Sequence, residues 1–148
     1  KYALDVKPYN TTDTNITWES CSLREWLNGT FLEHAFSQSE QDMIKLTSNE
    51  SSQDKVFLLS RTEVQSYFKT DEERKVERTE YAAEKIGYDG YGSWWLRSQT
   101  DAYFSNAADT VDGNGSLYLT WSRKIRILAF RVDQNLSVRP VIWVDIGQ

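Results

Sequence analysis

The chain has 148 residues, of which 39% are hydrophobic and 26% charged, and these proportions suit one globular domain with its own core. Two prolines and seven glycines exclude a collagen-like or linker-like chain. The net charge of −5 disfavours nucleic acid and anionic lipid as partners, because binding to phosphate is mainly electrostatic. No apolar run approaches the roughly 20 residues of a membrane helix. We therefore expect neither a nucleic-acid partner nor membrane insertion.

Short helices are expected through the first half of the chain. The stretch from Tyr2 to Tyr9, which precedes these helices and contains Pro8, favours an edge strand or an extended lead-in over a central strand. A capping box pairs a Ser with a Glu three residues later, and it marks the start of a helix. Three such pairs occur: Ser22 with Glu25, Ser37 with Glu40 and Ser60 with Glu63. The first helix is expected to stop at Gly29.

The middle of the chain contains an apolar run and a densely charged stretch. The run from Val56 to Leu59 predicts a short strand. The stretch from Lys69 to Glu80 is predicted to be a solvated linker or an exposed helix. A last short helix is expected to end at Gly87.

Strands are expected in the second half, with a hairpin turn at residues 112–115 between Val111 and Leu117. The segments concerned are Trp94–Ser98, Ala102–Asn106, Leu117–Trp121, Lys124–Val132 and Val138–Ile146, of which the last two are predicted to be central. Helices followed by strands indicate an α+β domain with short helices in the first half and an antiparallel or mixed sheet in the second.

The sequence offers no catalytic set or cofactor motif. Cys21 and His34 are the only residues of their types, so neither an internal disulfide nor a four-ligand zinc site can be assembled. Both lie in predicted helices beside large apolar residues, which favours a buried thiol and a half-exposed imidazole over a nucleophile and its base. We therefore predict no catalytic residues, metal or cofactor.

Two patterns leave alternatives open. Asp109, Asp112 and Asn114 could supply oxygen ligands to calcium, although plain turn formation is the favoured interpretation. Six of the seven asparagines open an Asn-x-Ser/Thr triplet, which indicates either glycosylation of an exported protein or the ordinary use of these residues in turns and caps. The six are Asn10, Asn15, Asn28, Asn49, Asn114 and Asn135.

Aromatic rings beside polar donors in the second half can stack on sugars or hold a peptide. The candidate ligand-binding residues are Trp95, Arg97, Asp101, Tyr103, Asn106 and Trp121. The alternative is that most tryptophans form the core and that Arg97 or Arg139 are buried hydrogen-bond hubs to loop carbonyls. We favour this alternative for most of the set.

Several short motifs run through the chain in a fixed order. They are Trp18-Glu-Ser, Leu23-Arg-Glu-Trp-Leu-Asn, Ala35-Phe-Ser, Val56-Phe-Leu-Leu-Ser, Trp94-Trp-Leu-Arg-Ser and Val138-Arg-Pro-Val-Ile-Trp. With these, the sequence resembles a family of uncharacterised bacterial domains, common in gut Firmicutes, over nearly its whole length. That family is in turn distantly similar to the C-type-lectin-like fold of the formylglycine-generating enzymes and of variable ligand-binding proteins. The resemblance implies a C-type-lectin-like α+β fold.

The resemblance also shows departures. Family members usually begin with a strand or hairpin before the position of Lys1, so we expect a single domain over residues 1–148 that lacks this element. Gln99 and Ser137 stand where Pro and Gly are frequent. The copper-binding cysteine pair of the formylglycine-generating enzymes has no match beside the single Cys21, so that activity is not carried over.

We therefore expect a non-catalytic ligand-binding or display domain of an exported or cell-surface bacterial protein, with a glycan or protein as ligand. The first alternative is an enzyme with a cleft where Asp101 or Asp109 meets Arg97 or Arg139. The second is a purely structural module. The sequence does not define the oligomeric state.

Overall fold

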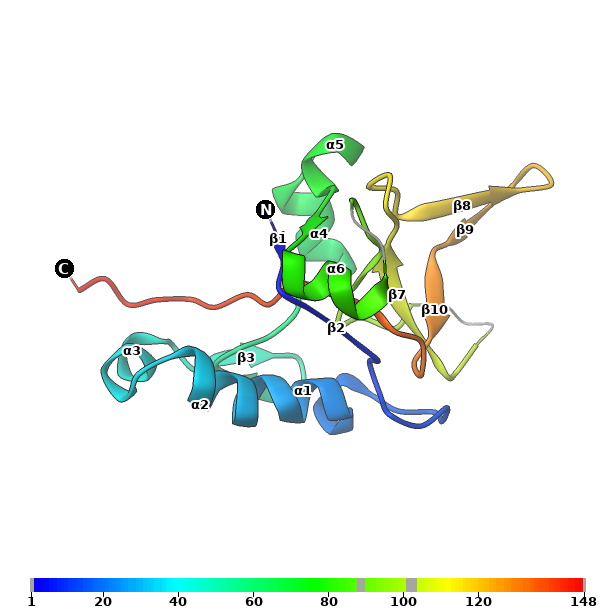
Figure 1. Cartoon of the computed structure of the whole chain (residues 1–148). Coiled ribbons are helices and arrows are strands. Elements are labelled where there is room, and N and C mark those ends of the chain that lie inside the picture. The colour runs from blue at the N-terminus through cyan, green and yellow to red at the C-terminus, as the bar shows by residue number, and fades with distance from the viewer. Residues whose placement is uncertain (1, 88–89, 101–103, 148) are drawn as a thin grey trace.

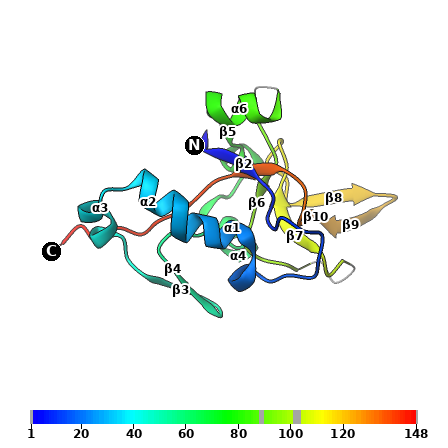
Figure 2. The ribbon, with the colours of Figure 1, turned by 60° about the horizontal axis from the view of Figure 1, so that its bottom comes forward.

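The computed structural model describes residues 2–87, 90–100 and 104–147. One helical segment, from α1 to α3, runs along one side of the molecule, and α4, α5 and α6 gather on the opposite side (Figure 1). The strands β7 to β10 form one end. The C-terminal segment runs out at the other end, as a second view also shows (Figure 2). No described helix is long and apolar enough to span a lipid bilayer.

The first helical segment is built from several short pieces. They are η1 (Trp18–Ser20), α1 (Ser22–Trp26), the π-helical turn η2 (Leu27–Phe31), α2 (Leu32–Ala35) and α3 (Gln38–Met43). The cap of α1 is Cys21, whose Sγ accepts from the backbone N–H of Arg24, and not Ser22 as predicted. The segment also continues past Gly29. In a π turn the hydrogen-bonded residues are five positions apart, so Leu27 and Leu32 both lie on the buried face.

The opposite side carries α4 (Arg61–Tyr67), α5 (Asp71–Arg74) and α6 (Glu80–Ile86). The predicted capping boxes at Ser37 and Ser60 are confirmed. Each Ser hydroxyl accepts from the backbone N–H of the Glu three residues later, and the carboxylate of that Glu accepts from the backbone N–H of the Ser. Thr70 forms a third box with Glu73 inside the charged stretch, which is therefore partly an exposed helix. Helix α6 ends at Gly87 as predicted, with φ of +82°.

A five-stranded sheet has the order β10-β7-β6-β11-β2. Its strands are β2 (Asp5–Lys7), β6 (Trp94–Trp95), β7 (Ala107–Val111), β10 (Ala129–Arg131) and β11 (Leu136–Val138). The pairing of β11 with β6 is parallel and the other pairings are antiparallel, so the sheet is mixed and the fold is α+β as predicted. Strand β2, from the predicted N-terminal strand, lies at one edge.

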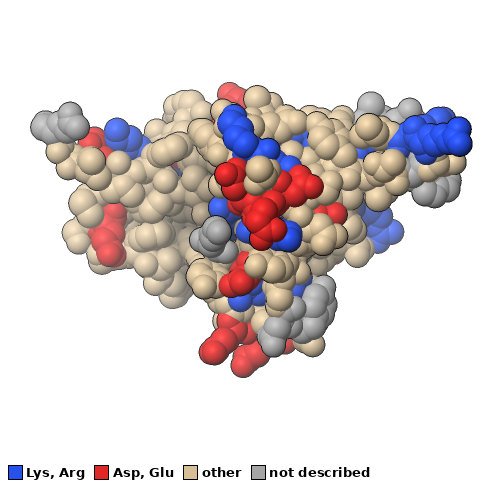
Figure 3. All heavy atoms as spheres, turned by 90° about the horizontal axis from the view of Figure 1, so that it is seen from above, with Lys and Arg blue, Asp and Glu red and all other residues tan. Residues whose placement is uncertain are grey.

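Three two-stranded sheets complete the described strands. They pair β1 (Tyr2–Ala3) with β5 (Glu77–Arg78), β3 (Thr47–Asn49) with β4 (Ser52–Asp54), and β8 (Tyr118–Trp121) with β9 (Lys124–Ile127). The β8–β9 hairpin projects from the body (Figure 1) and carries the exposed cations Arg123, Lys124 and Arg126. Basic atoms gather at that end of the molecule and acidic atoms gather over the middle (Figure 3).

Four strand predictions are wrong, and a fifth fails in the part of it that the structure describes. The turn at residues 112–115 forms, but β7 before it pairs with β6 and β10 and not with β8. The hairpin turn is instead at Ser122 and Arg123, which both have positive φ, as a type I′ turn requires. The expected strand from Lys124 to Val132 is split at Leu128 into β9 and the edge strand β10, so it is not central.

The other two wrong predictions concern the runs Val56–Leu59 and Val138–Ile146. Both are mostly extended segments that touch at an isolated bridge between Phe57 and Val141. Only the start of the second run joins a strand, β11. Of the predicted strand Ala102–Asn106, residues 104–106 form no strand and residues 102–103 lie outside the described residues.

The core consists of two clusters that meet at the Trp94–Trp95 strand. Trp95 belongs to the cluster around α1 and η2, and Trp94 belongs to the cluster beneath α4. Successive side chains of a strand point to opposite faces, so adjacent tryptophans fill both. Each indole N–H donates to a backbone carbonyl: that of Trp94 to Arg74 at 3.1 Å and that of Trp95 to Lys7 at 2.9 Å.

Comparing two glycines with nearly equal φ tests how closely the backbone at Gly115 packs against the backbone at Asp71. Gly115 has φ of +85° and a side chain there would collide with the carbonyl of Asp71, whereas Gly87 has φ of +82° and open space. Alanine in this conformation costs about 1–2 kcal/mol at either site. We expect Gly115→Ala to lower the free energy of unfolding more than Gly87→Ala does, by at least about 1 kcal/mol, in urea titrations. Equal losses would contradict this packing.

Candidate functional site

The structure places the predicted ligand-binding residues in different environments. Trp95 is fully buried in the core cluster around α1 and η2, with its ring edge-on to Tyr9 at 5.6 Å. Asn106 is half-buried and lines a hollow at the sheet edge. Asp101 and Tyr103 lie outside the described residues, as does the side chain of Trp121. Of this set, Asn106 is therefore placed at a hollow, whereas Trp95 is part of the core.

Arg97 is a buried hub, as the alternative interpretation predicts. Its guanidinium donates to the carbonyl of Leu58 at 3.0 Å and to both carboxylate oxygens of Glu63, at 2.5 and 3.2 Å. Burial alone raises the pKa of Glu63, but hydrogen bonds from Arg97 and Ser60 hold that pKa below its usual value. Arg97 thus fixes the start of α4 to the segment that follows strand β6.

Arg139 is held differently. Its guanidinium stacks on Phe68 at 4.8 Å and on Trp94 at 4.9 Å, and burial lowers its pKa. The Nη1 atom has no hydrogen-bond partner among the described residues. Arg139 is therefore an aromatic-stacked part of the scaffold and not a hub to loop carbonyls.

Asp109 is a fully buried acceptor in β7. It accepts from Arg61 Nε at 3.2 Å, from the Ser98 hydroxyl at 2.9 Å, and from the hydroxyl and backbone N–H of Thr100 at 2.7 and 3.0 Å. Asp112 accepts instead from backbone groups of its own turn. No cluster of three or more acidic, His or Cys side chains suited to a metal is found in the described ranges. Both aspartates act as structural acceptors here.

The acid–arginine cleft of the enzyme alternative is not assembled from the residues that can be placed. Asp109 pairs with Arg61, Arg97 pairs with Glu63, and Arg139 stacks on aromatic rings. Cys21 is buried as predicted, and burial raises its pKa to about 11, so the thiol stays protonated at neutral pH. His34 is exposed, and its Nδ1 lies 2.7 Å from the carbonyl oxygen of Thr30.

Three of the Asn-x-Ser/Thr asparagines have structural roles. Asn10 and Asn49 are buried. The Asn28 side chain donates to the carbonyl of Val56 at 2.8 Å and accepts from the backbone N–H of Lys55 at 2.9 Å. These three side chains serve the turns and loops around them, as the simpler interpretation predicts.

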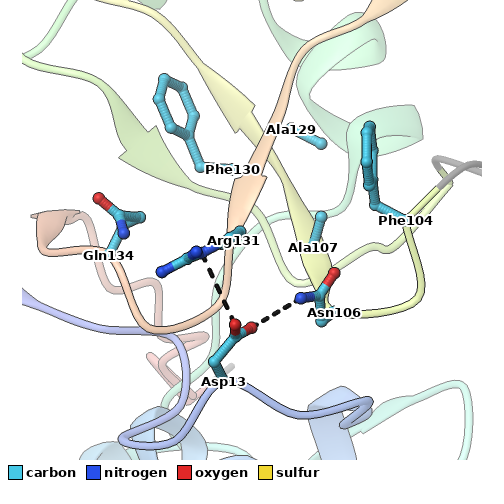
Figure 4. Close-up of a pocket in the computed structure, with 8 residues that line it drawn as sticks. All are labelled: Asp13, Phe104, Asn106, Ala107, Ala129, Phe130, Arg131 and Gln134. Carbon is cyan, nitrogen blue, oxygen red and sulfur yellow. Dashed lines mark hydrogen bonds and ion pairs between the residues drawn. The ribbon is translucent and has the colours of Figure 1, made fainter.

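A hollow with a volume of about 630 Å³ lies beside the edge strand β10 (Figure 4). It is lined by two phenyl rings, two alanines and four polar side chains: Phe104, Phe130, Ala107, Ala129, Asp13, Asn106, Arg131 and Gln134. Phe104 is 56% exposed and Phe130 37% exposed. The hollow therefore offers apolar surface and planar polar groups to solvent at the same place.

A small polar network closes one end of this hollow. Asn106 donates to Asp13 at 2.7 Å, and Arg131 Nε lies 3.8 Å from the other Asp13 oxygen. Arg131 also donates twice to Asp133, at 3.1 and 2.9 Å, and this contact raises the pKa of Arg131 and lowers that of Asp133. The network orients the donors and acceptors that a ligand would meet.

Sequence reasoning missed all but one of the residues in this hollow. Asp13 lies in a polar loop 93 positions from Asn106, and no local pattern links two such distant residues. Phe104 lies two residues before Asn106, so an exposed aromatic close to a candidate polar residue was the signal that could have found it. Arg131 and Phe130 were assigned to a central strand, which hid their place at an edge.

The fold and hollow define an α+β domain with an aromatic and polar recess at the edge of its sheet. Residues 1–146 match the family described as a domain of unknown function (DUF6273), so the chain belongs to this family. No curated protein and no solved structure matches the chain.

Replacing the Arg97 guanidinium tests its structural role. Arg97→Ala removes the guanidinium that donates to the Leu58 carbonyl and to the Glu63 carboxylate, so we expect a loss of about 3 kcal/mol in the free energy of unfolding. Chemical denaturation monitored by tryptophan fluorescence measures this loss. A variant as stable as the parent would show that Arg97 is not part of the scaffold.

The Glu63 carboxylate gives a pH-dependent test. Its folded pKa is lowered, so its contribution is complete above its unfolded pKa and is lost as the pH falls through the folded value. We expect Glu63→Gln to destabilise the protein at pH 7 and to differ less from the parent at pH 3. A stability difference that stays constant from pH 7 to pH 3 would contradict the assignment.

Proposed function

We propose that this domain is a non-catalytic ligand-binding module and that its ligand, a glycan or a protein segment, occupies the hollow beside β10. The observation that carries the proposal is the joint exposure of two phenyl rings and a pre-oriented polar network there. Phenyl rings stack on sugar rings or apolar side chains, and planar amide, carboxylate and guanidinium groups fix orientation.

We also propose that the domain belongs to an exported or cell-surface bacterial protein and is distantly C-type-lectin-like. What supports the fold relationship is a mixed sheet preceded by short helices, together with the Trp94–Ser98 and Val138–Trp143 motifs. What supports the localisation at the cell surface or outside the cell is the resemblance to the bacterial family. The structural-module alternative is supported by the burial of Trp94, Trp95 and Arg97.

A pair of equally exposed aromatic residues tests the binding proposal. Panels of saccharides and short peptides are first screened by two-dimensional NMR, and the affinity of any compound that shifts Asn106 and Arg131 is measured. We expect Phe104→Ala to weaken binding at least about ten-fold, because a lost ring contact costs about 1.4 kcal/mol. Tyr81→Ala is the control, since Tyr81 is 57% exposed and does not line the hollow.

Two outcomes would overturn the proposal. One is that neither panel shifts any residue of the hollow. The other is that Phe104→Ala and Tyr81→Ala reduce affinity equally, which would place the ligand elsewhere.

A further inference from the structure

The register of the sheet determines which backbone groups of β10 face outward. The backbone N–H of Thr110 donates to the carbonyl of Leu128 at 3.0 Å, and the backbone N–H of Val132 donates to the carbonyl of Asn106 at 2.9 Å. In an antiparallel ladder hydrogen-bonded pairs alternate, so Phe130 and its partner Ala108 form the pair between them. The N–H and C=O groups of Ala129 and Arg131 therefore point away from β7.

This outer side of β10 is a sheet edge. Among the described strands, β10 pairs within the sheet with β7 alone. The Arg131 carbonyl accepts from the backbone N–H of Gln134 at 3.1 Å. Among the described residues, the N–H groups of Ala129 and Arg131 and the carbonyl of Ala129 have no hydrogen-bond partner. They are open to another chain, which is the arrangement that strand addition uses.

The hollow lies along this same edge. Phe130 points to one side of β10, and Ala129 and Phe104 lie on the other (Figure 4). An added strand would send alternate side chains to these two sides. The charge of Arg131 is already opposed by Asp133 and Asp13, so the edge favours uncharged side chains over acidic ones.

We propose that the ligand of the hollow is an extended, uncharged peptide segment that adds to β10 as a further strand. This inference rests on the proposed function and narrows its ligand to a protein segment. The N–H groups of Ala129 and Arg131 donate to the peptide backbone, and one of its side chains packs between Phe104 and Ala129. Recognition is thus mainly through the main chain, with side-chain preference set by the two phenyl rings.

Modified peptides test the main-chain contacts without changing the protein. Acetylated and amidated pentapeptides, with valine, leucine or phenylalanine alternating with threonine, are titrated into the full chain and followed by NMR. We expect the backbone amides of Ala129 and Arg131 to shift. Methylating the three central amide nitrogens of the best binder should weaken it at least ten-fold, although every side chain is retained.

A substitution in β10 gives the complementary test. Ala129→Pro removes an outward N–H and leaves the Phe130–Ala108 pair intact, and proline is tolerated at sheet edges. We expect it to weaken peptide binding at least five-fold, whereas Ala129→Ser, which keeps the N–H, should bind as the parent does. If Ala129→Pro fails to fold, the methylated peptide still decides the question.

The remaining outcomes are distinct. Equal binding of the methylated peptide would overturn strand addition. Binding of saccharides but not peptides would overturn this inference and leave the proposed function standing, and binding of neither would overturn both. Dimerisation in sedimentation experiments that Ala129→Pro abolishes, without peptide binding, would assign the edge to a second copy of the chain.

Discussion

The ion pair between Arg61 and Asp109 joins helix α4 to the five-stranded sheet. Asp109 lies in the middle of β7 and is inaccessible to solvent, and Arg61 is the first residue of α4. The same guanidinium donates to the carbonyls of Leu117 and Leu128. Leu117 directly precedes β8 and Leu128 directly follows β9, so both ends of the hairpin are bound. A buried charge needs such partners, because isolating it from water costs several kcal/mol. Helix, sheet and hairpin are thereby held at fixed positions.

A second buried carboxylate does the same for the first helical segment. Asp54 accepts from the Trp18 indole at 3.0 Å, from Ser52 at 2.7 Å and from Arg24 at 2.5 Å. Burial by itself raises the pKa of Asp54, but these bonds hold it below its usual value. The conspicuous motifs have similar roles: in the Trp94–Ser98 run two indoles fill the core clusters, Arg97 holds α4 and Ser98 bonds Asp109. These motifs identify the scaffold and not the ligand.

The fold was predictable where local chemistry decides it. The boxes at Ser37 and Ser60 and the stop at Gly87 depend on neighbouring residues, and all three are confirmed. The predicted cap of α1 was wrong by one residue, because the thiol of Cys21 and not the hydroxyl of Ser22 caps this helix. Predictions of strand pairing were wrong more often. The turn at residues 112–115 has the composition of a hairpin turn, but the strands on its two sides, β7 and β8, do not pair with each other. The hollow could not be predicted from local sequence patterns, because it brings together Asp13 and Asn106, which are 93 positions apart.

The hollow and the scaffold share few residues, and this separation bears on how the domain could diversify. Exposed Asp13, Phe104 and Gln134 come from three different loops and take no part in the buried hubs around Asp109 and Asp54. Exchanging them alters the rim but removes no interior contact, so the energetic penalty should be slight. Related chains could thus acquire new specificities by rim substitutions alone, while a common interior preserves their shape.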